Sequence, residues 1–108
     1  MARYLFQASF TSEAWAAQVK NPQNRIEALR PVIEGLGGSL ESFYYAFGEY
    51  DVVAIAEMPD NVSAAAFSLA ASAGGALKAV KTTPLMTIEE GIEAMRKAAG
   101  AGYRPPGR

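Results

Sequence analysis

The stretch from Ser39 to Asp60 constrains the fold of this chain more than any other. Two runs rich in aromatic and β-branched residues, Leu40–Phe47 and Val52–Met58, flank a short segment that begins with Gly48. This pattern predicts a β-hairpin, with Gly48 at a positive φ angle and Asp51 bonding to its own backbone. Neither run has a wholly polar face, so the two strands need cover on both sides of the sheet.

The rest of the chain alternates between strand and helix patterns. Residues 3–10 and 76–83 have the apolar and polar alternation of strands. Pro84 breaks the second run, so its continuation through Leu85 and Met86 is expected to be an edge or a bend. Helical spacing of apolar residues predicts a short helix after Ser12, a helix that restarts at Pro22 and ends at Gly37 and Gly38, an alanine-rich helix over residues 62–73, and a terminal helix over residues 88–99.

This order of elements predicts an α+β fold of the ferredoxin-like βαββαβ type with an extra C-terminal helix. Such a fold has a four-stranded antiparallel sheet with two helices on one face. The other face carries apolar residues here, so we expect a second copy to cover it and form a dimeric α+β barrel, with a higher assembly of dimers also open. Residues 1–99 would form a single domain, and residues 100–108 a flexible tail.

The composition excludes several classes of function. The chain has 108 residues, no cysteine, no histidine and a formal net charge of -1. We therefore expect no metal site, no bound cofactor and no Ser-His or Cys-His catalytic pair. The absence of a basic surface, of a long apolar run and of a signal peptide predicts a cytoplasmic protein without nucleic-acid or membrane partners.

The stretch FYYAFGEYDVVAIAEMPD resembles the GYD domain family, through Gly48, Tyr50 and Asp51 in the hairpin and the Pro59–Asp60 stop after the next strand. The similarity extends over residues 3–99. This family is placed in the dimeric α/β barrel superfamily, so the resemblance implies that fold and self-association, but it implies no settled activity.

The candidate functional residues are one carboxylate and a set of aromatic side chains. Asp51, next to Tyr50, is a candidate general base, although we favour a structural role in which its carboxylate bonds to backbone amides. The aromatic residues that could line a ligand pocket are Tyr4, Trp15, Tyr44 and Tyr45. The alternative is that these side chains pack in the core or in a dimer interface. Arg25 and Arg30 could hold an anionic ligand, and solvated helix charges are the safer interpretation.

Two functions remain open on the sequence. The first is a homo-oligomeric module that binds a small, partly apolar molecule between sheet and helices or at the subunit interface. The alternative is a cofactor-independent monooxygenase or an isomerase of the dimeric α/β barrel type, in which Asp51 or a tyrosine would handle the proton. An enzyme requires a pocket with at least two convergent polar groups, whereas a binding module requires shape and apolar lining.

Overall fold

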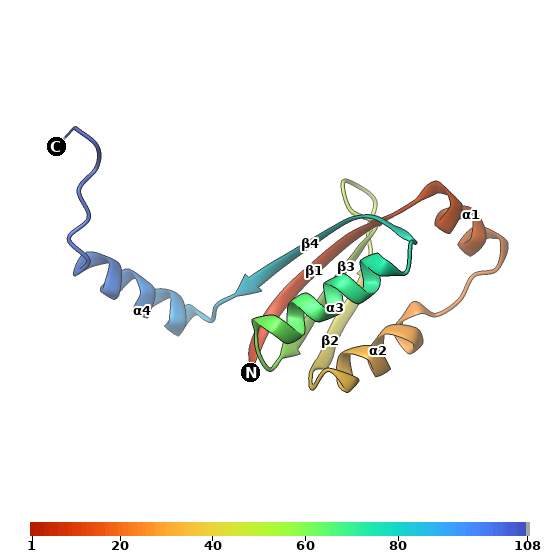
Figure 1. The fold of residues 1–108 in the computed structure, drawn as a ribbon, viewed down its shortest axis with the longest axis horizontal. Helices are drawn as coiled ribbons and strands as arrows, with labels where there is room; N and C mark the ends of the chain where they lie inside the picture. The colour runs from red at the N-terminus through yellow and green to blue at the C-terminus, as the bar shows by residue number, and fades with distance from the viewer. Residues whose placement is uncertain (108) are drawn as a thin grey trace.

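The computed structural model describes residues 1–107 and shows one four-stranded antiparallel sheet with helices α2 and α3 on one face (Figure 1). The elements follow the chain as β1 (Ala2–Phe10), α1 (Ser12–Lys20), α2 (Arg25–Gly35), β2 (Ser39–Tyr45), β3 (Val52–Met58), α3 (Asn61–Ala73), β4 (Leu77–Leu85) and α4 (Ile88–Ala99). The strands lie in the order β2-β3-β1-β4. The predicted ferredoxin-like α+β fold is confirmed. Pro84 does not break the last strand, because β4 lies at the edge of the sheet and continues through Pro84 to Leu85.

Two glycines terminate α2, and an aspartate caps the start of α3. α2 ends at Gly35 with Leu36 as its C-cap residue, and Gly37 follows at a φ of 88°. The Gly37 and Gly38 amides donate to the carbonyls of Glu34 and Ile33, which is the Schellman pattern of helix termination. Asp60 caps α3 by accepting a hydrogen bond from the Ser63 backbone amide, and this bond lowers the pKa of the Asp60 carboxyl.

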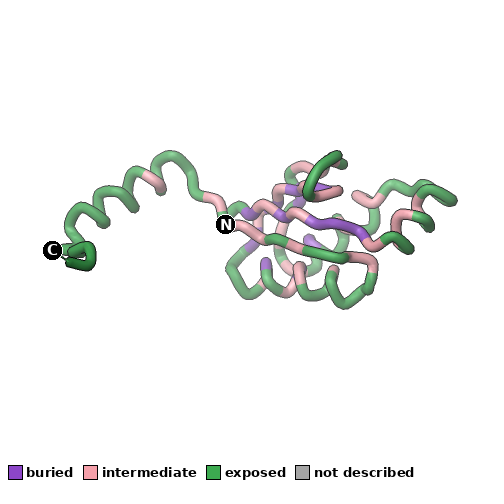
Figure 2. The backbone as a smooth tube through the Cα atoms, turned by 90° about the horizontal axis from the view of Figure 1, so that it is seen from above, coloured by how far each residue is buried: buried purple, intermediate pink, exposed green. Residues whose placement is uncertain are grey.

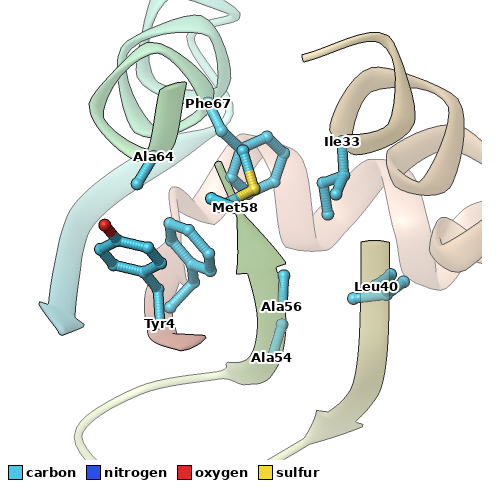
Figure 3. Close-up of a cluster of buried hydrophobic side chains, with 9 residues drawn as sticks. Tyr4, Ile33, Leu40, Ala54, Ala56, Met58, Ala64 and Phe67 are labelled. Carbon is cyan, nitrogen blue, oxygen red and sulfur yellow. The ribbon is translucent and has the colours of Figure 1, made fainter. Parts of the chain in front are cut away.

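The core lies between the sheet and helices α2 and α3 and consists of two clusters of buried side chains. Alternate residues of β1 and β3 point toward the helices, as the register Tyr4 to Ala56 and Phe6 to Ala54 requires. The larger cluster, shown in Figure 3, contains Tyr4, Phe6, Ile33, Leu40, Ala54, Ala56, Met58, Ala64 and Phe67. The smaller cluster contains Ala8, Phe10 and Val52. The space between these clusters is where the candidate site lies.

Within residues 1–107, no helix covers the opposite face of the sheet (Figure 1). Its centre is apolar and half-buried, with Leu5 paired to Ile55 across β1 and β3. Tyr44 on β2 continues this patch and is 68% exposed. At one end Arg3 bridges Glu41, at 2.8 Å between Nε and Oε2, and Glu57. The sequence prediction of an uncovered sheet face with an apolar centre agrees with this arrangement.

Helix α4 extends away from the sheet and the other helices, with the C-terminus beyond it (Figure 1). Nearly all of this arm is exposed, as the burial colours in Figure 2 show. The predicted capping box of Thr87 and Glu90 is present. The apolar stripe of α4 nevertheless faces solvent, because Ile88 is 77% and Met95 is 69% exposed.

The hairpin between β2 and β3 differs from the prediction in its loop. β2 ends at Tyr45, so Phe47 belongs to the loop and is fully exposed. Gly48 does not have a positive φ angle, so that prediction was wrong. The loop spans residues 46–51 and closes through a hydrogen bond from the Ala46 amide to the Asp51 carbonyl. A loop of this length can reverse the chain without the left-handed residue that a tighter turn needs.

Candidate ligand-binding cavity

A cavity of about 280 Å³ lies between the sheet and the helices α2 and α3. Its floor is formed by the helix-facing side of the sheet, where Phe10, Phe43 and Val80 belong to three different strands. Leu29 of α2 and Ala71 of α3 form the opposite wall. The cavity therefore separates the two clusters of the core.

Small side chains explain why this space is not filled. Ala8 and Ala54 are neighbours on the floor of the cavity, where β1 and β3 pair. Above them, α3 presents Ala71 on the same stripe as the buried Ala64 and Phe67, one turn further along the helix. Alanine in facing positions leaves a gap that larger side chains would close. The alanine-rich composition of α3 is thus a cause of the cavity.

The lining is almost entirely apolar, and its polar members are few. Ser68 of α3 lines the cavity, and its hydroxyl forms a hydrogen bond with the hydroxyl of Thr82 on β4. Arg25 of α2 is the other lining residue whose polar side chain can face the cavity. Gln7 also belongs to the lining, but it pairs with Lys81, and the alternation of β1 turns its side chain toward the uncovered face of the sheet. An apolar cavity with a few polar groups at its edge is the usual form of a small-molecule site.

Asp51 connects the hairpin loop to the wall of the cavity. One carboxylate oxygen accepts hydrogen bonds from the Phe10 backbone amide at 2.9 Å and from the Trp15 indole nitrogen at 3.1 Å. The Asp51 amide in turn donates to the Ala8 carbonyl. The Trp15 ring packs edge-on against the Phe10 ring, with 5.2 Å between the ring centres. Asp51 thereby holds α1 against the end of β1, next to the cavity.

The aromatic residues proposed from sequence to line a pocket lie elsewhere in the fold. Tyr4 is buried in the larger core cluster, and its hydroxyl donates to the side-chain carbonyl of Asn61. Trp15 packs outside the cavity on Phe10 and Tyr45. Tyr44 lies on the uncovered sheet face. None of these four aromatic residues lines the cavity described above.

The two candidate proton-transfer residues also lie outside the lining of the cavity. Tyr50 is half-buried in the hairpin loop. The Asp51 carboxylate bonds to a backbone amide, in accord with the structural role favoured from the sequence, but that amide belongs to Phe10 on another strand. Among residues 1–107, no group of three or more carboxylates is placed to hold a metal ion.

Apart from Arg25, which the sequence offered as a possible anion-binding residue, the residues that form the cavity were not recognised from the sequence. The available signal was the coincidence of alanines on α3 with alanines at the helix-facing positions of β1 and β3. The sequence predicted aromatic side chains as the pocket lining instead, because aromatic residues dominate most binding sites.

Comparison with known proteins gives one family. The family model of the GYD domain matches residues 4–95. A comparison with curated protein sequences gives no significant match. In the part of the chain that the structure describes, no helix has the length and apolar character needed to cross a membrane.

Proposed function

This chain belongs to the GYD domain family, and we propose that it is a homo-oligomeric module that binds a small, partly apolar molecule between its sheet and helices. The observation that carries the proposal is the apolar cavity between α2, α3 and the sheet. Leaving such a space empty costs stability, because the surrounding side chains lose packing contacts. A ligand of matching shape would restore those contacts.

The cavity volume limits the size of the ligand. An apolar cavity of about 150 Å³ accommodates benzene. The volume of about 280 Å³ found here therefore suits a molecule of roughly 11 non-hydrogen atoms. If each atom contributes about 0.5 kcal/mol, the binding free energy is about 5.5 kcal/mol and the Kd about 0.1 mM.

The uncovered sheet face and α4 support self-association. The apolar centre of the sheet face, surrounded by the polar side chains of Arg3, Glu57 and Lys81, has the anatomy of a protein interface. An isolated helix as short as α4 is marginal in water, so its exposed stripe also requires a surface to pack on.

The available area indicates that both surfaces contribute to one interface with a second copy. Strand spacings give the sheet face a footprint of roughly 480 Å². A standard interface buries about 800 Å² on each partner. A helix of the length of α4 adds roughly 180 Å², which brings the total to roughly 660 Å², within the range of about 600 to 1,000 Å² per partner for standard interfaces. The second copy is therefore the occupant that we propose for the sheet face and for α4.

Isothermal titration calorimetry with 3-phenylpropanamide, a neutral probe of about 11 non-hydrogen atoms, tests the binding function. We expect saturable binding by the wild type with a Kd of about 0.1 mM. Ala71→Leu places a larger side chain in the cavity and should weaken binding at least about tenfold while raising the melting temperature, since it fills empty space. Ala65→Leu is the matched control, because Ala65 is an exposed α3 residue that does not line the cavity.

Two outcomes would contradict the proposal. The wild type would show no saturable heat up to about 10 mM probe, which is two decades above the expected Kd. Alternatively, Ala71→Leu and Ala65→Leu would bind the probe equally well, which would place the site outside the cavity.

A further inference from the structure

Arg25 is the charged residue among those that line the cavity. It is the first residue of α2 and is half-buried at the edge of the apolar space. Within residues 1–107, no carboxylate lies at ion-pair distance from its guanidinium, since the ion pairs of this part of the chain are those of Arg3. No acidic residue lines the cavity either. A guanidinium beside an apolar space and without a protein partner is suited to bind an anion.

A second depression, between α1 and the start of α2, meets the cavity at this arginine. The residues common to both are Phe10, Arg25 and Ala76. Both spaces have mostly apolar linings, but the depression has three amide residues in its lining, which are Gln18, Asn21 and Gln23. Arg25 therefore lies between an apolar cavity and a depression with more polar residues around it.

The geometry points to a small apolar carboxylic acid as the ligand, with its ring or chain in the cavity and its carboxylate on the Arg25 guanidinium. This inference rests on the proposed function and adds the chemical class of the ligand. A planar carboxylate can accept two parallel hydrogen bonds from a guanidinium, which a neutral amide cannot match.

The ends of the two helices fix the orientation of such a ligand. The positive end of α2 coincides with Arg25, so it favours a negative charge at that position. The C-terminal end of α3 borders the cavity at Ala71 and Gly74, and its carbonyl groups disfavour an anion there. The carboxylate is therefore placed at the α2 side and the apolar part beneath α3.

The test compares 3-phenylpropanoate with its neutral isostere 3-phenylpropanamide in calorimetric titrations of the wild type. We expect the acid to bind roughly tenfold more tightly than the amide at low salt, because one charge-assisted pair at a half-exposed position is formed. Added salt should reduce this preference. Arg25→Gln should remove the preference, so that acid and amide bind with equal Kd values, and Arg25→Lys should retain part of it. Arg30→Gln is the matched control, since Arg30 is an exposed residue of the same helix that does not line the cavity.

The outcomes separate this inference from the proposed function. Equal binding of acid and amide by the wild type, both blocked by Ala71→Leu, would overturn the role of Arg25 and preserve the cavity as a binding site. A preference for the acid that survives Arg25→Gln, or that Arg30→Gln also removes, would overturn it as well. Failure of both probes to bind would overturn the proposed function itself.

Discussion

Replacing Asp51 by alanine tests whether this carboxylate has a structural role. The substitution removes the shared acceptor of the Phe10 amide and the Trp15 indole. Hydrogen bonds to a charged group contribute roughly 1.5–3 kcal/mol when buried. The Phe10 residue is buried, so its lost bond costs about 2 kcal/mol, whereas half-buried Trp15 can bond to water and its loss costs about 1 kcal/mol.

The expected total is about 3 kcal/mol, which for a domain of this size lowers the melting temperature by roughly 12 °C. Urea unfolding measures the loss in the free energy of unfolding. The transition is monitored by far-UV circular dichroism and by the fluorescence of Trp15, the single tryptophan of the chain. Asp51→Asn keeps one acceptor oxygen and should lose about half as much. The Glu49→Ala control should stay within about 0.5 kcal/mol, since the Glu49 side chain is exposed and its contribution to the loop is a backbone carbonyl that accepts from Ser9.

A double-mutant cycle with Trp15→Phe isolates the indole bond. We expect a coupling free energy of about 1 kcal/mol between Asp51 and Trp15. If Asp51→Ala lost less than about 1 kcal/mol, or if the coupling were zero, the structural interpretation of Asp51 would fail. Such a result would favour the alternative, in which Asp51 is a catalytic base in the hairpin loop.

Two further predictions concern the sheet. Ile55→Glu places a charge in the centre of the uncovered face, so it should convert the oligomer into a folded monomer in sedimentation equilibrium. Val62→Glu, at an exposed position of α3, should leave the oligomer intact. A monomeric wild type would contradict the proposed interface. Gly38→Ala should lower the free energy of unfolding by roughly 2 kcal/mol, as measured in urea. The Cβ of the new alanine would lie 2.5 Å from both the Glu57 carbonyl oxygen and the Met58 sulfur, which is too close for either contact. Gly48→Ala should change stability by less than about 0.5 kcal/mol, and equal losses at both glycines would refute this contrast.

The fold could be predicted from the sequence because each strand, helix and turn is indicated by a pattern of a few neighbouring residues. The alternation in residues 3–10, the hairpin and the glycine pair after α2 are each defined by a few residues, and their order leaves few topologies open. The φ angle of Gly48 could not be predicted in the same way. It depends on where β2 ends, and the aromatic Phe47 extended the predicted strand into the loop.

The candidate site depends on contacts between distant parts of the chain. The carboxylate of Asp51 was expected to bond to backbone amides, but its partner Phe10 is 41 residues away and is brought close by the pairing of β1 with β3. The cavity arises where alanines from β1, β3 and α3 meet, and no single segment carries that information. The sequence offered Arg25 and Arg30 equally as anion-binding residues and favoured solvated charges for both, and only the fold shows that Arg25 lies at the edge of this space.

Binding of a small apolar molecule in the space between the sheet and helices α2 and α3 can be followed residue by residue. We would titrate the protein with 3-phenylpropanamide and record two-dimensional ¹⁵N–¹H NMR spectra. We expect saturable shifts concentrated at lining residues such as Phe10, Leu29 and Val80, and we expect Ala71→Leu to lose them. Shifts that are absent, or that map instead to the uncovered sheet face around Ile55, would contradict binding in this space.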